Sequence, residues 1–263
     1  MARFTPKPLA LALFLVSVGA HGQSQQGNPI SHTLNVGAYF AQGDYGEPTD
    51  TEILYLPLSY QANIGKWGFQ VLVPHLSVTG TGNVLVNIGG VTRAVAGTEE
   101  ATQRGLGDTV ASVSYQLDPW SDRAPFIDLR LDVKLPTADE NKSLGTGEVD
   151  YSVQADFSRN WGSNVLFATV GYNFRGESEL FTGLEDSAFA QLGFATPVNE
   201  RVNIGAFYDY RERASLFSAE SHELLPYFTW QVTPDWSVTG LLSWGFTDAS
   251  ADTAVQVQLS YRW

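Results

Sequence analysis

The stretch FIDLRLDVKLP, residues 126–136, places four ionisable side chains two residues apart: Asp128, Arg130, Asp132 and Lys134. Apolar residues fill the positions between them, so the segment has the period of a β-strand with one apolar face and one charged face. Charges of both signs on one face can form ion pairs that brace a sheet, or select solutes in a pore. The charged face therefore requires either bulk water or an enclosed wet space.

Two further segments place polar side chains on one face of a strand. Residues 149–158 and 201–211 alternate in the same way, and their opposite faces carry mainly aromatic and aliphatic side chains. The candidate lumen and selectivity residues from the three segments are Asp128, Arg130, Asp132, Lys134, Asp150, Gln154, Asp156, Asp209 and Arg211.

If the strands at 125–135 and 149–158 are neighbours, Asp150 is expected near Lys134 and Asp156 near Asp128. Two interpretations of these charges stay open. They can form a ladder of cross-strand salt bridges that stiffens the wall. They can also form a polar constriction, in which Asp132 and Lys134 help to set ion selectivity.

A catalytic alternative rests on His75 and Ser77 in the segment HLS, 75–77. Both side chains are expected on the lipid-facing side of a strand, where an outer-membrane lipid hydrolase has its nucleophile and base. Such chemistry also needs a third group that orients the histidine. Only Asn83 and Asn87 are available, in a long loop, so we expect no catalytic site.

Composition excludes several other classes of function. The chain has 263 residues, no cysteine and four histidines, so neither thiolate metal sites nor disulfides can form. We expect no metal and no cofactor. With a net charge of −13, it has no basic patch for nucleic acid, and no glycine-rich loop leads into a helix that could bind a nucleotide.

The amino terminus predicts export. Arg3 and Lys7 precede the apolar run LALALFLV at 9–16, and small residues follow at Ala20 and Gly22. This pattern is typical of a secretory signal peptide over residues 1–22, which leaves a mature chain of 23–263. The apolar run is too short to span a bilayer as a helix.

The mature chain alternates between apolar and polar residues nearly to its end. Most candidate strands run to ten residues or more, long enough to cross a bilayer at a tilt and longer than the strands of most globular sheets. Short, turn-rich connections alternate with longer acidic ones, as in outer-membrane barrels. The expected strands are 32–42, 51–62, 66–77, 108–117, 125–135, 149–158, 164–175, 187–196, 201–212, 222–232, 235–246 and 253–263.

These features predict an all-β transmembrane barrel, antiparallel and up-and-down, with about twelve strands. Aromatic residues cluster near the ends of the apolar faces, as expected for two interfacial girdles. The terminal Tyr261 and Trp263 resemble the carboxy-terminal insertion signal of bacterial outer-membrane proteins. Outer-membrane lipid, lipopolysaccharide and the barrel-assembly machinery are therefore expected partners.

The long loops contain two features outside the strand pattern. Residues 82–97 are expected to form an extracellular hairpin that turns at Gly89-Gly90 and extends the wall or covers the mouth. The acidic loops are expected either to be a solvated surface or to bind divalent cations that bridge lipopolysaccharide.

Three motifs, GLGD at 105–108, VKLPTAD at 133–139 and LGTGEVDYSVQ at 144–154, resemble the family named for the meta-pathway of phenol degradation. The resemblance implies an outer-membrane barrel with twelve strands that passes small, aromatic or apolar molecules. Pro136 can end a strand and the motif glycines permit a tight return. The motif glycines and turn residues are Gly105, Gly107, Asp108, Pro136, Gly145 and Gly147.

Together these observations predict a passive transporter or channel for small molecules in the outer membrane. Side chains fill the interior of a barrel with eight strands, and a barrel with sixteen strands leaves an aqueous channel. A barrel with twelve strands has an interior of intermediate width. A barrel with a closed lumen and a structural or surface role is the alternative.

Overall fold

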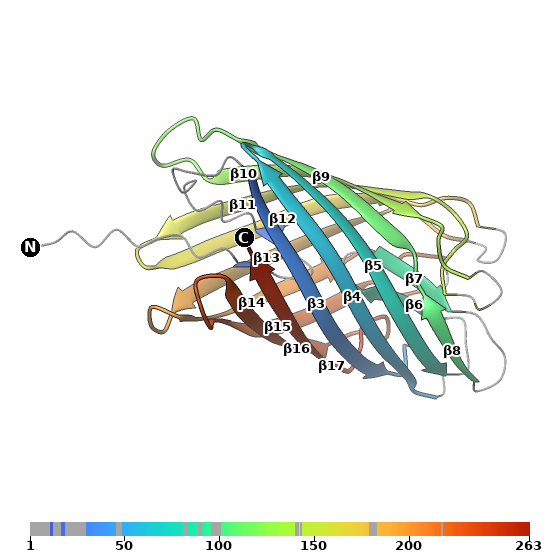
Figure 1. Ribbon diagram of the computed structural model, residues 1–263. Helices are drawn as coiled ribbons and strands as arrows, with labels where there is room; N and C mark the ends of the chain where they lie inside the picture. Colours follow the sequence, from blue (N-terminus) through green and yellow to red (C-terminus); the bar gives the residue numbers. More distant parts are fainter. Residues whose placement is uncertain are drawn as a thin grey trace, which may run out of the picture.

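The polypeptide forms one antiparallel sheet that closes into a barrel (Figure 1). The computed structural model describes residues 11–12, 17–18, 30–45, 49–80, 84–88, 91–95, 101–139, 142, 144–178, 183–216 and 218–263. The wall consists of β3 (Ile30–Gly43), β4 (Thr51–Ile64), β5 (Trp67–Gly80), β8 (Ala101–Leu106), β9 (Thr109–Leu117), β10 (Phe126–Leu135), β11 (Asp150–Trp161), β12 (Asn164–Phe174), β13 (Ser187–Pro197), β14 (Val202–Arg211), β15 (Ser221–Gln231), β16 (Trp236–Gly245) and β17 (Thr253–Arg262).

The wall has twelve strand positions, because β8 and β9 share one of them. The first half of β5 pairs with β9 and its second half with β8. Between the two pieces the chain leaves the ladder at Gly107 and Asp108, although the Gly107 amide still donates to the Pro74 carbonyl at 2.9 Å. β3 pairs with β17 and with β4, and β4 pairs with β5, so the first and last strands close the barrel.

The predicted barrel is confirmed, and each expected strand overlaps a wall strand with ends that differ by at most three residues. The prediction missed β8 and placed Asp108 at the start of a strand. In the structure Asp108 lies in the break between β8 and β9, where its carboxylate bonds to the Ala138 amide in the loop after β10 and to the side chain of Lys134.

The inward and outward faces alternate as predicted. On β17, Val255 and Val257 are exposed, whereas Gln256 and Gln258 are buried inside the barrel. Leu192 of β13 is 67% exposed on the outer surface. An outer surface of exposed aliphatic and aromatic side chains around a polar interior is stable in lipid, which confirms the prediction of a transmembrane barrel.

Short connections gather at one end of the barrel, as predicted. The last strand returns there, because the Arg262 amide donates to the Asp235 carbonyl at 2.8 Å, and Trp263 and His32 exchange backbone hydrogen bonds of 2.9 and 3.1 Å. The short connections are 65–66, 118–125, 162–163, 198–201 and 232–235.

Two predicted segments are described only in part. Of the predicted signal peptide, only β1 (Leu11–Ala12) and β2 (Ser17–Val18) lie within the described residues, so its cleavage stays a prediction. Within 82–97, β6 (Val84–Ile88) and β7 (Val91–Val95) pair in an antiparallel manner. Gly89 and Gly90 are outside the described residues, so the extracellular hairpin that turns there stays a prediction. Over the described part of the chain, no helix is long and apolar enough to cross a membrane.

Candidate functional site in the barrel lumen

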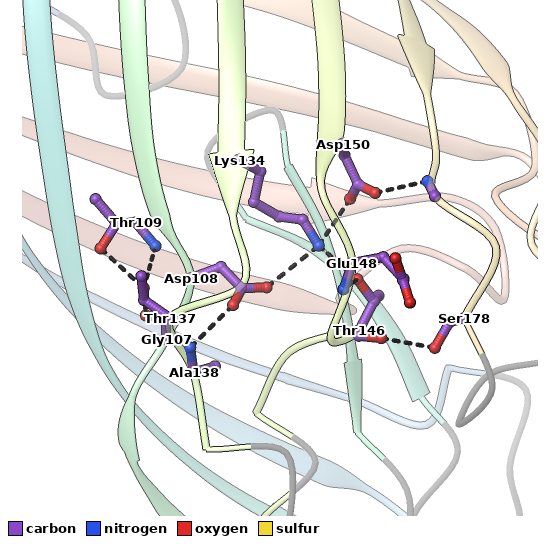
Figure 2. Close-up of polar contacts among 11 residues, drawn as sticks. Gly107, Asp108, Thr109, Lys134, Thr137, Ala138, Thr146, Glu148, Asp150 and Ser178 are labelled. Carbon is purple, nitrogen blue, oxygen red and sulfur yellow. Dashed lines mark hydrogen bonds and ion pairs between the residues drawn. The ribbon is translucent and has the colours of Figure 1, made fainter.

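Lys134 is the centre of a buried polar cluster at the end of the barrel with the long loops. Its Nζ lies 2.8 Å from Asp150 Oδ2 and 3.2 Å from Asp108 Oδ2, and it donates to Thr146 Oγ1 at 2.5 Å. Figure 2 shows that these side chains reach Lys134 from separate segments of the chain. Two carboxylates around one ammonium leave a net negative charge in a site where Lys134 is only 2% exposed. The expected contact between Asp150 and Lys134 is confirmed.

The three sequence motifs meet at this cluster. GLGD contributes Asp108, VKLPTAD contributes Lys134, and LGTGEVDYSVQ contributes Thr146 and Asp150. The Asp108 carboxylate also accepts a hydrogen bond from the backbone amide of Ala138 at 3.1 Å, which ties the loop after β10 to the break in the wall. The motifs therefore describe one tertiary contact, which we call the Lys134 cluster (Asp108, Lys134, Thr146 and Asp150).

Glycine is required at two positions of the loop that carries Thr146. A Cβ atom at Gly145 would lie 2.5 Å from Asp108 Oδ2, so a larger residue would displace the carboxylate. Gly147 has a φ angle of 75°, which residues with a side chain adopt at a cost. The tight return that the sequence predicts here is confirmed by this geometry.

The loop between β10 and β11 folds toward the interior of the barrel. Leu144 is 1% exposed and packs in an apolar cluster with Ile53, Tyr55 and Leu76 of the wall. Thr137, one residue after Pro136, accepts from the Thr109 amide at 2.8 Å. These contacts hold residues 136–139 and 144–149 across the inner edge of the mouth.

The next long loop is joined to the same cluster. The Gly176 amide donates to Asp150 Oδ1 at 3.0 Å, and Ser178 Oγ donates to the Thr146 carbonyl at 2.6 Å. Arg175 donates to Ser187 Oγ at 2.9 Å. Burial lowers the pKa of the Arg175 guanidinium from its ordinary value, while the nearby Asp150 carboxylate opposes this effect.

A second polar group faces the lumen below the Lys134 cluster. Arg130 Nε lies 2.6 Å from Asp132 Oδ1, two residues along the same strand. Its Nη2 donates to Ser112 Oγ at 2.9 Å and to Gln70 Oε1 at 3.2 Å. Lys134–Asp150 is thus a cross-strand rung of the predicted ladder. The ion pair of Arg130 instead lies within its own strand, because its directly paired neighbour on β11 is the neutral Gln154.

Asp128 and Asp156 occupy directly paired positions on β10 and β11, as expected. Asp156 accepts from Thr169 Oγ1 at 2.6 Å and from Gln154 Nε2 at 2.8 Å. These two hydrogen bonds come from neutral groups, so they leave the charge of the Asp156 carboxylate in place.

A third group lies on β13 and β14. Arg211 Nε lies 2.8 Å from Asp209 Oδ2, and Gln191 Nε2 donates to Asp209 Oδ1 at 2.5 Å. The Arg211 guanidinium is 5.0 Å from the centre of the Phe189 ring. Sequence reasoning identified Asp209 and Arg211 and missed Gln191 and Phe189, which share the inward face of β13 and could have been found by following that alternation.

The inward side chains continue from strand to strand as a polar row. Each member is directly paired with the next, and the row rises from the short-turn end at β9 to the long-loop end at β15. Its members, in order, are Gln116, Asp128, Asp156, Thr169, Gln191, Asp209 and Glu223.

An apolar ribbon runs beside the polar row. Its first row contains Val165, Ala195, Gly205, Tyr227, Leu241, Gln256, Tyr39, Tyr55 and Leu76, each directly paired with the next. Inward positions two residues along the strands widen the ribbon with Phe167, Phe207, Leu225, Ala41, Ile53 and Val78. The inward positions predicted for Tyr55, Phe167, Phe207 and Tyr227 are confirmed.

The apolar ribbon spans the depth of the membrane. Its first row begins at the second residue of β12, near the short turns, and reaches Leu76, beside the long-loop end of β5. Eight steps of about 4.8 Å between strands tilted by about 40° raise the row by roughly 25 Å. This rise matches the apolar band of a transmembrane barrel, about 25 Å tall.

The terminal aromatic residues lie on the outer surface at the short-turn end. The Trp263 ring stacks on His32 at 5.4 Å and on Tyr261 at 5.3 Å. These contacts join the last strand to the first, so the predicted insertion signal lies at the closure of the barrel.

His75 is exposed on the outer surface, as expected. No hydrogen bond joins His75 to Ser77 among the residues that the structure describes. Asn83 and the side chain of Asn87 lie outside what the structure describes, so the third catalytic group stays untested.

Comparison with protein families gives a match over residues 34–263 to the family described as "MetA-pathway of phenol degradation". The match covers the whole described wall except the start of β3. This chain belongs to that family. The resemblance carried by the three motifs is therefore confirmed, and the Lys134 cluster is where this member brings them together.

Solved structures with a similar fold are outer-membrane channels and porins. The COG4313 outer membrane channel from Pseudomonas putida F1 is 11% identical with a TM-score of 0.65, covering 89% of this chain and 95% of that one. The CymD monoaromatic hydrocarbon channel is 10% identical (TM-score 0.52; 98% and 94% covered), and the NanC porin is 8% identical (TM-score 0.55; 87% and 98% covered). Comparison with curated protein sequences gave no match.

The shared fold and the apolar outer surface place the protein in the bacterial outer membrane. A closed barrel with exposed apolar side chains on its outside is the form in which β-strands cross a membrane, because closure satisfies every edge.

Proposed function

We propose that this family member is a passive channel for small molecules, and that aromatic and other apolar solutes are among those it passes. The observation that carries the proposal is the apolar ribbon, which runs along the inner wall across the depth of the membrane and is interrupted in its first row by Gln256. A pore for hydrophilic solutes needs only a polar lining. The name of the CymD structure refers to a channel for monoaromatic hydrocarbons, which supports the same class of solute here.

The two polar groups of the lumen have different roles in this proposal. The Lys134 cluster braces the mouth, because all three charged members are bonded and nearly buried. Arg130 and Asp132 are more accessible, with side chains 17% and 14% exposed, and form the polar constriction that selects ions. The selectivity that the sequence assigned to Asp132 and Lys134 is thus proposed for Asp132 with Arg130.

Refolded protein in planar bilayers and in liposomes tests the proposal. Single-channel steps in potassium chloride, together with swelling of liposomes in small sugars or amino acids, are the expected result. Liposomes that contain heat-denatured protein are the control. Absence of both conductance and swelling, with folding confirmed by circular dichroism, would contradict the channel and favour a closed barrel.

The closed barrel is supported by one observation. Phe167, Phe207 and Tyr227 pack together on the inner wall and are almost completely buried. In that alternative the apolar ribbon is packing, and the protein has a structural role or binds a partner at its surface.

We propose no enzymatic role. The channels and porins with this fold support that view, and within the described part of the chain His75 and Ser77 make no contact that would activate a nucleophile. A phospholipid-hydrolysis assay with Ser77→Ala as control tests it: hydrolysis by the natural protein that the substitution abolishes would contradict the proposal.

The remaining partners are proposals as well. The exposed apolar band is suited to outer-membrane lipid, the acidic long loops to lipopolysaccharide through divalent cations, and the terminal Trp263 to the barrel-assembly machinery. Signal-peptide cleavage after residue 22 belongs with them and is tested by mass spectrometry of the protein isolated from membranes.

A further inference from the structure

Midway along the strands, the inner wall of the barrel is buried on one side and accessible on the other. The inward side chains midway along β13, β14, β16 and β17 are all buried, among them Gln191, Phe207, Leu241 and Gln258. On β5, β9, β10 and β11, which are consecutive in the wall, the corresponding inward side chains are half-buried instead. The half-buried polar residues of these four strands form what we call the polar face: Gln70, Ser112, Ser114, Arg130, Asp132, Ser152 and Gln154.

The open space of the lumen lies against the polar face. Buried side chains are covered by one another, so the opposite side of the lumen is packed at this depth. Half-buried inward side chains continue toward the short turns with Asn63 and Gln116. They continue toward the long loops with Asn173, which is directly paired with Ser152. The accessible surface thus extends along the barrel in both directions.

The polar face is continuous from strand to strand. Its first row consists of residues that are each directly paired with the next: Gln70, Ser112, Asp132 and Ser152. One inward position closer to the short turns, Arg130 is directly paired with Ser114 on one side and with Gln154 on the other. Because the two rows are adjacent, the lumen meets an unbroken surface of hydrogen-bonding groups.

The polar face carries no net charge. Its two charged side chains, Arg130 and Asp132, form an ion pair of 2.6 Å, and Arg130 also donates to Gln70 and Ser112. The remaining members are serines and glutamines, whose hydroxyl and amide groups both donate and accept hydrogen bonds. A solute on this face therefore meets donors and acceptors but no uncompensated charge.

We propose that hydrophilic solutes cross the barrel along the polar face, and that this face favours small neutral molecules with several hydroxyl groups over zwitterionic or charged molecules. The inference rests on the proposed channel function and adds a class of solute to it. The surface that such a solute contacts is provided by the side chains that are accessible from the lumen.

The preference follows from what each solute loses and gains. A hydroxyl group exchanges its hydrogen bonds to water for equivalent ones to serine hydroxyls and glutamine amides. A charged group also loses water, at a higher cost, and gains no counter-charge, because Arg130 and Asp132 already neutralise each other. The wall thus replaces the hydration of a polyol better than that of an ion.

Modification of single cysteines tests the position of the passage. The natural chain has no cysteine, so Ser112→Cys and Ser152→Cys each introduce one thiol with little change in shape. We expect 2-(trimethylammonium)ethyl methanethiosulfonate to lower the single-channel current of both variants by about half or more, because the attached group fills part of a narrow lumen. Dithiothreitol should restore the current.

Two serines of the packed side are matched controls. Ser59 of β4 and Ser243 of β16 also point inward, but each is only 1% exposed. β16 lies on the opposite side of the wall from β10. The current of Ser59→Cys and Ser243→Cys should not change on exposure to the same reagent.

Swelling of liposomes tests the class of solute. Erythritol is neutral and has four hydroxyl groups, whereas serine is zwitterionic and smaller. We expect erythritol to enter at least about threefold faster than serine through the natural protein, against the order that size alone predicts. Modified Ser112→Cys should lose most of the erythritol entry, and liposomes with heat-denatured protein give the background rate.

The outcomes separate this inference from the proposed function. Current that modification lowers equally in all four variants, or only in the two controls, overturns the position of the passage and leaves the channel. Current that is unchanged in Ser112→Cys and Ser152→Cys, with labelling verified by mass spectrometry, overturns it as well. Entry of serine as fast as erythritol overturns the class of solute. Absence of any conductance and swelling overturns the channel and this inference with it.

Discussion

Lys134 and Asp150 occupy directly paired positions on β10 and β11, and Lys134 Nζ lies 2.8 Å from Asp150 Oδ2. The same ammonium lies 3.2 Å from Asp108, which is in the break between β8 and β9. One side chain thus joins a regular rung of the wall to the point where the wall is interrupted. Because both loops next to it bond to the same cluster, the arrangement of the mouth depends on this contact.

Lys134→Met is expected to destabilise the barrel strongly. Removing the ammonium leaves the buried carboxylates of Asp108 and Asp150 without their counter-charge, which typically costs about 3–5 kcal/mol. Unfolding by guanidinium in lipid vesicles measures the effect. Lys142→Met is the control, since Lys142 forms an exposed ion pair with Asp139 at 3.8 Å and should change the free energy of unfolding by less than about 1 kcal/mol. Equal stability of the two variants would show that the cluster does not brace the mouth.

Gly145→Ala is expected to disturb the cluster through Asp108. The new Cβ would lie 2.5 Å from Asp108 Oδ2, so the carboxylate must move away from Lys134. We expect a loss of about 1–3 kcal/mol, in the range of overpacking changes. In an Asp108→Ala background the same substitution should cost much less, because the colliding group is gone. Additive losses in this double-mutant cycle would rule out the contact as the cause.

Arg130 and Asp132 are expected to shift ion selectivity in opposite directions. Asp132→Asn removes a negative charge from the constriction and should move the reversal potential in a salt gradient toward anion selectivity. Arg130→Gln should move it toward cation selectivity. Asp122→Asn, in an exposed short turn, is the matched charge control. A reversal potential that neither lumen variant changes would remove the selectivity role.

Trp263→Ala is expected to reduce assembly of the barrel in the outer membrane. It removes three ring contacts, with His32, Tyr60 and Tyr261, each contributing about 0.5–1.5 kcal/mol, where the last strand meets the first two. The heat-modifiable folded band in membrane fractions measures assembly. Trp244→Ala removes an exposed aromatic residue of β16 at the opposite end and serves as control. If both variants assemble equally well, the terminal Trp263 has no special part in insertion.

Much of the barrel could be predicted from the sequence because a lipid-facing strand must alternate along its whole length. The parity of Val255, Val257 and Leu259 on β17 is enough to assign the outer face, and the inward Gln256 and Gln258 follow. β8 was not predicted because its sequence, ATQRGL, has few apolar residues. It forms the long-loop half of the strand position that it shares with β9, and apolar and polar residues do not alternate clearly there.

The sequence predicted which residues belong to the candidate site, but it did not predict all of the contacts among them. Alternation along one strand identified Arg130 as inward, and one interpretation of its charge was a salt bridge to the neighbouring strand. The structure instead pairs it with Asp132, because the register of β10 against β11 puts the neutral Gln154 opposite it. A shift of register by two residues would keep every side chain on its face and change every partner.

The sequence by itself determined the twelve strand positions of the wall, their two faces and most of the residues that line the lumen, since these depend on a local period of two. Only the tertiary structure decided which of these residues meet. The polar row and the apolar ribbon exist because tilted strands pair in one register, which aligns residues from seven strands in the row and from nine in the ribbon. The Lys134 cluster exists because the break at Asp108 and the return at Gly145 fold against the same strand end, a long-range contact that no local pattern encodes.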